Sequence, residues 1–394
     1  MKKGTFPIKR ITSGPNYHFI GYYGSQPQPW DARGKYLLCL EVPFQNRPPQ
    51  AEDSATVGII DLSRLEFIPL ARTYAWNFQQ GAMVHWLPPE SDSEIIFNVR
   101  QGKEFFSVIL DIHSGNKRIL PRPISALSHN GKYALSLNFA RLHVTRPGYG
   151  YAGVEDPFCK EPHPDKDGIY LLDLEKGEAK LIVSIKQIVD LYPHSEKVKD
   201  KTFWFNHTLF NPQDTRFAFL SRWKPEENKP HLTALFTANI DGSEVRCLVN
   251  YGLVSHYDWR NSEEILVWME GRKGKGFYLV EDREGGENKI VGKGILREDG
   301  HCSFSSSGEW ILLDTYPDEN RYQTLKIFNL KEEREIILGK FYSPPLFQGE
   351  IRCDLHPRWN REDTQVCFDS VHEGERQVYI MDVSQTTLRK ERRI

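Results

Sequence analysis

Four of the thirteen histidines stand at the same position of a repeated sequence pattern. Each lies three residues before an aromatic anchor that opens a turn. The four are His207, His256, His301 and His356, and their anchors are Phe210, Trp259, Phe304 and Trp359. Neutral imidazole is a preferred ligand of zinc and also suits copper, iron and nickel. If the repeats are equivalent structural units, the four side chains converge and predict a metal site.

Two cysteines flank this group, so several ligand sets are open. Cys302 follows His301 directly, and Cys353 lies three residues before His356. Three histidines with a water, or a mixed set of imidazoles and thiolates, would serve as well as four histidines. Four protein ligands are typical of a structural metal, and an open position is typical of a catalytic one. The alternative is that the histidines line a channel and bond only to water and backbone.

The elements that must position these histidines come from a sevenfold repeat. Each copy has an anchor, a turn rich in Asn, Asp, Ser and Gly, a β-rich run, and a second apolar run that ends near Asp or Asn. Such a unit supplies four antiparallel strands, one blade of a propeller, and ring closure removes exposed sheet edges. We therefore expect an all-β fold, a seven-bladed β-propeller formed by residues 1–394 as a single domain. The anchors are Trp30, Trp86, Leu127, Phe210, Trp259, Phe304 and Trp359.

The repeat also predicts which blades lack the histidine and how the ring closes. In blades 1 to 3 the equivalent position holds Pro27, Met83 and Ile124. The first strand of each blade lines the central channel, and its side chains alternate between two faces. Blades 4 to 7 should therefore aim their imidazoles at one side of the axis. Residues 7–12 are expected to add the outer strand of the last blade; alternatively, Leu388–Arg392 adds it.

The composition gives no sign of a membrane span or a nucleic-acid-binding surface. Hydrophobic residues make up 39% of the chain and charged residues 26%, with a formal net charge of −2. No stretch approaches the roughly 18 consecutive apolar residues of a spanning helix, and the charge gives no bulk attraction to nucleic acid. Met1–Phe6 contain two lysines with no apolar run behind them. We expect a cytoplasmic protein, or a periplasmic or secreted one whose leader was removed, in an oligomeric state left open.

Three long connections are expected on one face of the propeller. In each blade the connection between the second and third strands lies on the face opposite the first hairpin turn. The longest such connection, residues 142–168, is rich in Gly, Pro, Tyr and charge, and residues 43–56 and 224–231 are further examples. Long loops in compact domains are commonly functional, although solvated loops are the alternative. In the longest loop, the side chains that suit a polar, ring-shaped ligand are Arg146, Tyr149, Tyr151 and His163.

Several segments resemble a known enzyme family over about residues 17–383. The chain resembles the seven-bladed propeller polysaccharide lyases that depolymerise ulvan, and is more distantly similar to the propeller oligogalacturonide lyases. These families cleave a glycosidic bond next to a uronic acid by β-elimination. The matching segments are YHFIGYYG from residue 17, AWNFQQGAMVHW from 75, ISALSHNGKYALSLNFARL from 124, FNHTLFN from 205, VSHYDW from 254, DGHCSFS from 299 and IRCDLHPRW from 351.

The resemblance implies an anionic uronate-containing glycan as substrate and a divalent metal as cofactor. Zinc is the expected metal, with manganese or calcium as alternatives; it is structural in the ulvan type, whereas the oligogalacturonide type uses a channel metal to neutralise the uronate. A second catalytic histidine of some members has no counterpart here, because that region holds Phe105 and Phe106. The implied catalytic residues are His85, Tyr149, Tyr151, Arg146 and Arg222. The implied substrate-binding residues are Arg141, Asn206 and His163.

Two other functions compete with an ulvan-type lyase. One is an oligogalacturonide-type lyase whose channel metal is catalytic, and the other is a propeller that binds glycan or protein without catalysis, since the fold alone implies no function. The histidines lie three residues from the turn on the far face, so we expect them to be separated from the long loops. On this interpretation the metal holds blades 4 to 7 together, and tyrosine, histidine and arginine perform the chemistry above it.

Overall fold

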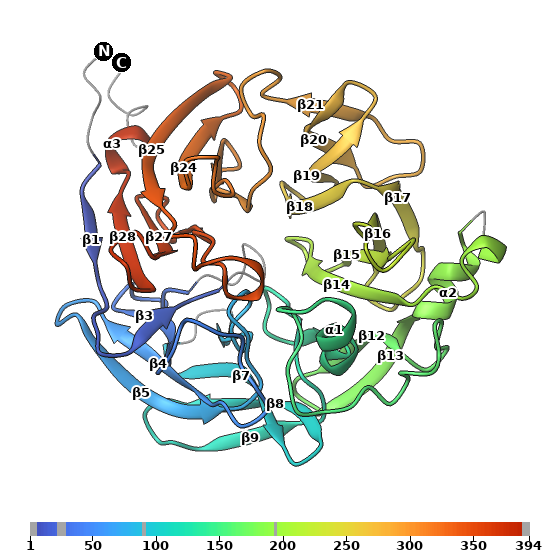
Figure 1. Ribbon diagram of the computed structural model, residues 1–394, viewed down its shortest axis with the longest axis horizontal. Coiled ribbons are helices and arrows are strands. Elements are labelled where there is room, and N and C mark those ends of the chain that lie inside the picture. Colours follow the sequence, from blue (N-terminus) through green and yellow to red (C-terminus); the bar gives the residue numbers. More distant parts are fainter. Residues whose placement is uncertain (1–5, 22–28, 89–91, 193–194, 388–394) are drawn as a thin grey trace.

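A computed structural model describes residues 6–21, 29–88, 92–192 and 195–387. Seven four-stranded antiparallel sheets are arranged radially around a central axis (Figure 1). The predicted all-β, seven-bladed propeller with four antiparallel strands per blade is therefore confirmed. Within the described residues, no helix is long and apolar enough to span a membrane.

The first four blades follow the chain in order, each from the innermost strand outward. Blade 1 contains β2 (Tyr17–Phe19), β3 (Tyr36–Val42), β4 (Ala55–Asp61) and β5 (Glu66–Thr73). Blade 2 contains β6 (His85–Trp86), β7 (Glu94–Gln101), β8 (Glu104–Asp111) and β9 (Lys117–Leu120). Blade 3 contains β10 (Ala126–Leu127), β11 (Tyr133–Ser136), β12 (Gly168–Asp173) and β13 (Glu178–Ser184). Blade 4 contains β14 (Phe203–Phe210), β15 (Arg216–Trp223), β16 (Leu232–Asn239) and β17 (Arg246–Gly252).

The last three blades complete the ring, and the final one combines both ends of the chain. Blade 5 contains β18 (Val254–Trp259), β19 (Glu264–Gly271), β20 (Gly274–Glu281) and β21 (Asn288–Val291). Blade 6 contains β22 (Cys302–Phe304), β23 (Trp310–Leu313), β24 (Tyr322–Asn329) and β25 (Arg334–Tyr342). Blade 7 contains β26 (Arg358–Trp359), β27 (Gln365–Ser370), β28 (Gln377–Asp382) and β1 (Ile8–Arg10).

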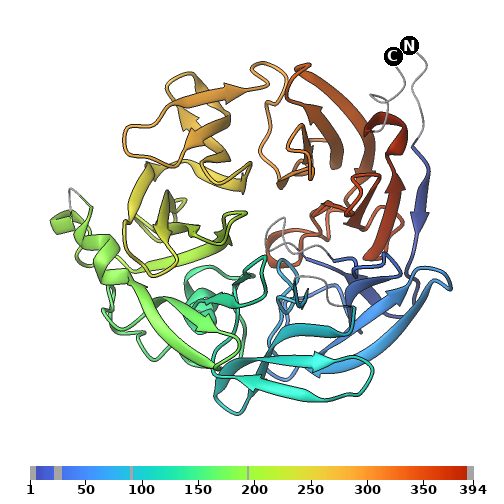
Figure 2. The ribbon, with the colours of Figure 1, turned by 180° about the vertical axis from the view of Figure 1, so that it is seen from behind.

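The ring closes through the N-terminal strand, as we predicted for residues 7–12. Strand β1 pairs antiparallel with β28, with Ile8 opposite Met381, and the two strands lie side by side in both views (Figures 1 and 2). The alternative closing segment, Leu388–Arg392, lies outside the described residues. Pairing the two ends of the chain in one sheet removes an open edge that would otherwise recruit another strand.

Three of the tryptophan anchors tie their blade to the one before it. The indole N–H of Trp86 donates to the carbonyl of Pro29 at 2.9 Å, and that of Trp259 donates to the carbonyl of Leu209 at 3.2 Å. Trp359 donates in the same way to Ser303 at 3.4 Å. In all three cases the acceptor lies one residue before the preceding anchor. The anchors therefore bury a large apolar ring between blades while satisfying its one polar atom.

The largest insertion folds over the inner edge of blade 4. Helix α1 (Phe139–Thr145) begins where the Asn138 side chain accepts from the backbone N–H of Arg141, and it packs against β14. The other helices are α2 (Ile185–Asp190) at the outer edge of blade 3 and α3 (Ser384–Thr387), with single 3-10 turns at Ser195–Lys197 and Gly349–Ile351. In Figure 1, α1 lies inside the ring and α2 outside it. This arrangement brings the chain after α1 toward the propeller axis.

Candidate active site

The four histidines of the repeat lie within or just before the inner strands of blades 4 to 7. His207 lies within β14 and His256 within β18, whereas His301 and His356 precede β22 and β26. The ring centroids of His256 and His301 are 4.2 Å apart, and those of His301 and His356 are 4.5 Å apart. The predicted convergence of neighbouring blades is therefore present for these three imidazoles.

Irregular backbone aims these side chains at the axis. His207 and His356 have positive φ angles of 50° and 46°, and Met83, at the equivalent position of blade 2, has 51°. The pairing of β14 with β15 shifts register next to His207, and that of β18 with β19 shifts next to His256. A bulge of this kind re-aims a side chain, and left-handed backbone in a non-glycine residue is strain that clusters at functional sites.

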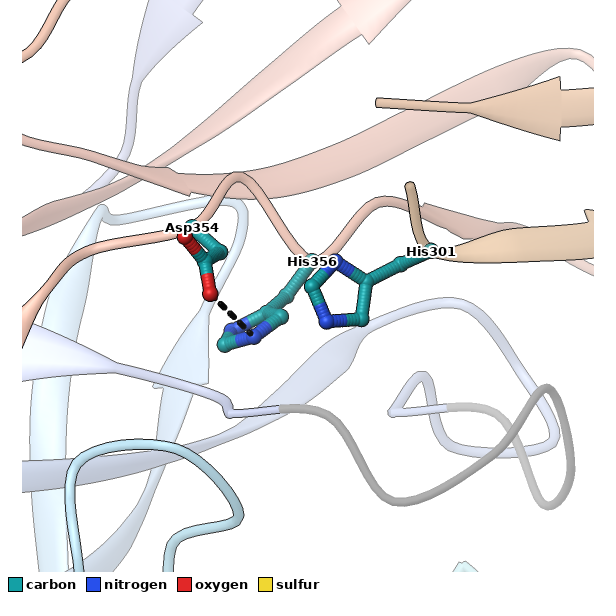
Figure 3. A group of neighbouring side chains, drawn as sticks. All are labelled: His301, Asp354 and His356. Carbon is teal, nitrogen blue, oxygen red and sulfur yellow. Dashed lines mark ion pairs between the residues drawn. The ribbon is translucent and has the colours of Figure 1, made fainter. Parts of the chain in front are cut away.

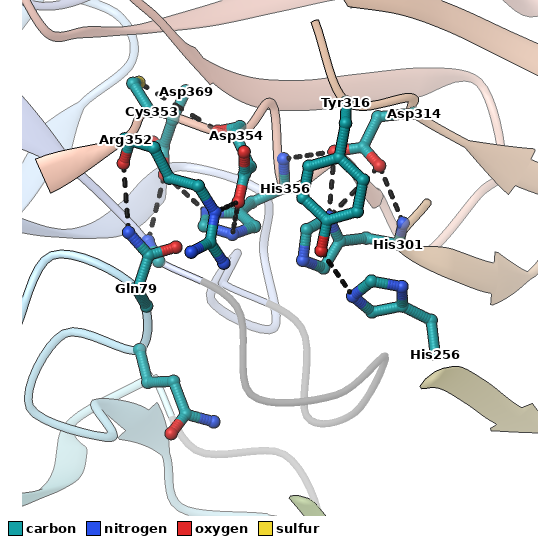
Figure 4. Close-up of polar contacts among 12 residues, drawn as sticks. Gln79, His256, His301, Asp314, Tyr316, Arg352, Cys353, Asp354, His356 and Asp369 are labelled. Atoms are coloured by element: carbon teal, nitrogen blue, oxygen red, sulfur yellow. Dashed lines mark hydrogen bonds and ion pairs between the residues drawn. The ribbon is translucent and has the colours of Figure 1, made fainter. Parts of the chain in front are cut away.

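Carboxylates fix the orientation of two of the imidazoles. The Nδ1 atom of His256 is 2.9 Å from Asp299 Oδ1. The Nδ1 atom of His301 is 3.0 Å from Asp314 Oδ2 (Figure 4). A carboxylate on one ring nitrogen leaves the other nitrogen to face a ligand. Burial lowers the pKa of His301, but the Asp314 carboxylate outweighs it and the pKa is raised. The surroundings of His301 therefore favour a positive charge.

A group suited to hold a metal forms from His301, Asp354 and His356. One ligand atom of each lies within 4.8 Å of the others, and all three residues are buried (Figure 3). The Oδ1 atom of Asp354 is buried and has no hydrogen-bond partner among the described residues, whereas its Oδ2 accepts from Arg352 at 2.6 Å. A buried, unsatisfied carboxylate oxygen is costly, and a cation satisfies it. The donor set thus fits a divalent cation, with two imidazoles, one carboxylate and room for an open position.

The long loop after α1 reaches the same place. Tyr149 and Arg146 line one pocket together with His207, His256 and Tyr316, and the ring centroids of Tyr149 and His207 are 5.5 Å apart. The predicted separation between the histidines and the long loops is therefore wrong. In blades 6 and 7 the inner strands have only three and two residues, so His301 and His356 already lie before the strand begins. In blades 4 and 5 the inner strands are longer, and the register shifts beside His207 and His256.

Two tyrosines in this pocket have pKa values displaced in opposite directions. Burial would raise the pKa of Tyr149, but the positive charges of Arg352 and Arg146 lower it to about 8. Arg352 Nη2 donates to the Tyr149 hydroxyl at 2.6 Å. Loss of hydration, reinforced by Asp354, raises the pKa of Tyr316 well above its ordinary value, although 37% of the residue's surface is exposed. The Tyr316 hydroxyl lies 3.5 Å from Nε2 of His256. At neutral to mildly alkaline pH, one phenol is therefore poised to lose its proton while the other keeps it.

The pocket also contains arginine charge that no described carboxylate neutralises. Arg222, at the end of β15, is 4% exposed, and its Nε and Nη1 atoms have no hydrogen-bond partner among the described residues. Burial, followed by the charge of Arg146, lowers its pKa to about 9. The Nε atom of Arg146 is also buried without a partner in the described chain. Buried guanidinium groups without a counter-ion mark a place for an anionic ligand.

Three of the residues implied by resemblance lie in packed surroundings. His85 is 1% exposed, and burial together with Arg358 lowers its pKa to about 3. Tyr151 stacks on Phe139 with ring centroids 4.3 Å apart and accepts a hydrogen bond from Asn98 at 3.1 Å. Asn206 is buried, and its Oδ1 accepts from the backbone N–H of His207 at 2.8 Å. None of the three lines the axial pocket.

The two remaining substrate-binding candidates hold the long loop in place. Arg141 pairs with Asp156 at 3.1 Å and donates to the backbone carbonyl of Phe203 at 2.7 Å. His163 donates from Nε2 to the carbonyl of Lys201 at 2.9 Å. Both residues therefore connect the insertion of blade 3 to blade 4, and neither lines the axial pocket.

The two cysteines point into apolar clusters instead of the metal-binding group. Cys302 packs in the cluster between blades 5 and 6, and Cys353 packs against Phe347 and Val371. Burial raises the pKa of Cys302 well above its usual value and that of Cys353 to about 12, and a protonated thiol is a poor metal ligand. Adjacent side chains of an extended chain point in opposite directions, so His301 faces the axis while Cys302 turns away.

Sequence reasoning missed three residues of the pocket region: Tyr316, Arg352 and Asp354. Asp354 is two residues before His356, and alternate residues of an extended segment share a face. That spacing was a usable signal for a ligand. Tyr316 lies between the second and third strands of blade 6, the same class of connection as the loop that carries Tyr149. Its position near the pocket was therefore predictable. Its raised pKa and its contact with His256 were not, because they depend on His256 and Asp354, which are distant in sequence.

Solved structures of other proteins share the fold of this chain. An oligogalacturonate lyase from Vibrio parahaemolyticus superposes with a TM-score of 0.65 at 15% identity, covering 96% of this chain and 94% of that one. An oligogalacturonate lyase in complex with manganese gives a TM-score of 0.66 at 14% identity, over 96% and 93% of the two chains. This chain has the same fold as these lyases.

Proteases share the propeller as well. The propeller domain of the trilobed protease from Pyrococcus furiosus gives a TM-score of 0.54 at 10% identity, covering 93% of this chain and 96% of that one. No protein-family model matches the chain, and no curated protein matches it by sequence. The likeness therefore establishes the fold alone, since lyases and proteases share it.

Proposed function

We propose that the protein is a lyase that cleaves uronate-containing oligosaccharides by β-elimination in the axial pocket. The observation that carries this proposal is the buried Arg222 guanidinium, which has no counter-ion among the described residues and lies beside tyrosines of opposite protonation tendency. A uronate supplies the missing carboxylate, and its C5 proton and glycosidic oxygen need one base and one acid.

The arginines would bind the carboxylate of the substrate. Arg146 and Arg222 both line the pocket, and guanidinium groups bind carboxylates through paired N–H donors. Their charge also stabilises the negative charge that develops on the carboxylate side of the sugar as C5 loses its proton. A neutral sugar would leave both guanidinium groups uncompensated, so the pocket selects for acidic sugars.

His301, Asp354 and His356 would hold a divalent cation next to this carboxylate. When bound, such a cation withdraws electron density from the uronate and makes the C5 proton more acidic. Manganese in a solved lyase of the same fold supports a divalent metal. Zinc, the metal expected from the sequence, also suits two imidazoles and a carboxylate.

Tyr149 would act as the base and Tyr316 as the acid. The phenolate of Tyr149, stabilised by Arg352, takes the C5 proton, and the C–H electron pair becomes the double bond between C4 and C5. The bond from C4 to the glycosidic oxygen breaks, and the phenol of Tyr316 donates its proton to that oxygen. The products are an unsaturated uronate and a sugar with a free hydroxyl, so protons and electrons balance.

The neighbouring histidines would position these groups. His256 lies 3.5 Å from the Tyr316 hydroxyl, and its other nitrogen is held by Asp299. Burial, followed by the charge of Arg222, lowers the pKa of His207 well below its ordinary value. A neutral His207 therefore packs edge-on against Tyr149 without adding a further charge.

A substrate panel tests the proposal. Purified protein with added manganese or zinc is incubated with oligogalacturonides, ulvan fragments and glycosaminoglycan fragments, and the ultraviolet absorbance of the unsaturated uronate is followed. Absorbance that grows with time for at least one acidic glycan is expected, and the panel also separates the ulvan type from the oligogalacturonide type. No product from any member would contradict the lyase proposal and favour a propeller that only binds.

A further inference from the structure

A second hollow opens next to the axial pocket, between blades 3 and 4. It has a volume of about 500 Å³, within the usual range of ligand sites. The residues of this groove that matter for its chemistry are Val144, Thr145, Lys201, Trp204 and Lys224. Val144 is 71% exposed although it is apolar.

The groove and the axial pocket share the same three chain segments. Arg146 of the axial pocket directly follows Val144 and Thr145 of the groove. Arg222 of the pocket pairs across the sheet with Trp204 of the groove. Lys224 lies two residues after Arg222, and Trp204 lies three residues before His207 on β14. The two hollows are therefore lined by neighbouring residues of the same three segments, near the ends of α1 and β15 and along β14.

The axial pocket is small compared with the groove. By the same measure it holds about 40 Å³, which is too little for a complete sugar ring since ligand pockets usually enclose at least about 300 Å³. The axial pocket can therefore receive the reacting edge of one uronate, with its carboxylate and C5. The rest of a substrate has to lie outside it, and the groove is the adjoining space.

The groove offers a sugar chain cations, carboxylates and hydrogen-bonding groups. Trp204 is 2% exposed, and its indole N–H has no hydrogen-bond partner among the described residues. Burial and the charges of Arg222, Arg146 and Lys224 lower the pKa of His231 to about 3, so three cations lie close together from the pocket to the groove. The charged residues that line the groove have both signs: Arg141, Lys201 and Lys224, and Asp156, Asp200, Glu226 and Glu227. The carboxylates provide acceptors for sugar hydroxyls.

We infer that this groove binds the sugar units next to the one that reacts, so that the substrate is an acidic oligosaccharide longer than a disaccharide. The inference rests on the proposed lyase activity and adds a minimum length for the oligosaccharide substrate. A second uronate placed beside Lys224 would find a cation there, and its ring would lie along the exposed side chain of Val144.

Chain-length dependence of cleavage tests the groove. The ratio of kcat/KM for a uronate tetrasaccharide to that for the disaccharide is measured in the wild type and in two pairs of variants. Val144→Trp fills the groove, and Ile119→Trp is its control, because Ile119 is also exposed but lies on β9 of blade 2. Lys224→Gln removes the groove charge, and Lys229→Gln is its control in the same loop, outside the groove lining.

The expected ratio is high in the wild type and falls by about tenfold in V144W and K224Q, equivalent to about 1.4 kcal/mol of differential binding. The two controls keep the wild-type ratio. Calorimetric binding of both oligomers to the Tyr149→Phe variant should show the same preference for the longer one. Cleavage with equal efficiency on both lengths, or an unchanged ratio in V144W and K224Q, would overturn the groove alone. Absence of product from every oligomer would refute the lyase activity and the groove with it.

Discussion

Arg352 donates a hydrogen bond from Nη2 to the hydroxyl of Tyr149 at 2.6 Å, although the two residues are 203 positions apart in the chain. Tyr149 comes from the insertion of blade 3, and Arg352 precedes the first strand of blade 7. The contact crosses the mouth of the propeller and, with Arg146, lowers the pKa of Tyr149 to about 8 against the opposing effect of burial. The proposed base is thus prepared by a residue from the far side of the ring.

The pH profile should report this contact. A base with a pKa of about 8 is mostly protonated at pH 7, so kcat/KM should rise as pH passes through 8 and then level off. Arg352→Gln removes the main charge that opposes burial, so the rise should move to higher pH. Arg352→Lys keeps the charge and should shift the profile less. An unchanged profile in R352Q would show that Tyr149 is not the base.

Arg222 should be a residue whose loss stabilises the fold. A buried guanidinium without a counter-ion is unfavourable, so Arg222→Met should raise the free energy of unfolding by about 1 to 4 kcal/mol while cleavage is lost. The matched control is Arg141→Met, because Arg141 is equally buried but pairs with Asp156. That variant should lower the free energy of unfolding by about 3 to 5 kcal/mol. Denaturant titration measures both, and destabilisation by R222M would mean that its charge is compensated.

Metal binding should depend on Asp354 and not on the cysteines. Asp354→Asn weakens the charge of the donor set and should reduce manganese or zinc affinity at least about tenfold. Cys302→Ala should keep the wild-type affinity, because its thiol packs in the apolar cluster between blades 5 and 6. Calorimetric titration of the metal-free proteins measures both. Loss of metal binding in C302A would indicate that the ligand set includes a thiolate as well as imidazoles.

His85 should act through stability. Its pKa is about 3 in the fold and about 6.5 in an unfolded chain, so the folded state favours the neutral ring. Its contribution to stability is complete above pH 6.5 and is lost as pH falls from 6.5 toward 3, by up to about 1.4 kcal/mol per pH unit. His85→Gln should therefore flatten the dependence of unfolding free energy on pH between 7 and 5. An unchanged slope would return His85 to the candidates for proton transfer.

The fold was predictable because three blades make the same contact with the blade before them, and this contact requires the same residue type at the same position of each of these repeats. Trp86, Trp259 and Trp359 recur because each must cover the neighbouring blade and donate to its carbonyl, and that requirement leaves a visible period. The histidines were visible for the same reason, since equivalent blades place equivalent residues around one axis. The spacing of residues in the sequence was therefore sufficient to predict the fold and the positions of the histidines.

The assembly of the pocket was not predictable in this way. The height of His207 depends on a bulge that shifts register in β14, and the short inner strands set the heights of His301 and His356. Arg352 and Tyr149 acquire their roles from a contact across the ring, which no local spacing encodes. Cys302 was misleading because proximity in sequence ignores the alternation that turns it away from His301.

The most direct test of the account compares the wild-type protein with Tyr149→Phe. Both proteins are supplied with manganese and a uronate tetrasaccharide, and the ultraviolet absorbance of the unsaturated product is followed at pH 8, with thermal unfolding recorded in parallel. Product is expected from the wild type, with a rate lower by about 10² to 10⁴ in Y149F and both proteins folded. Equal rates for the two folded proteins would contradict the role of Tyr149 as the base.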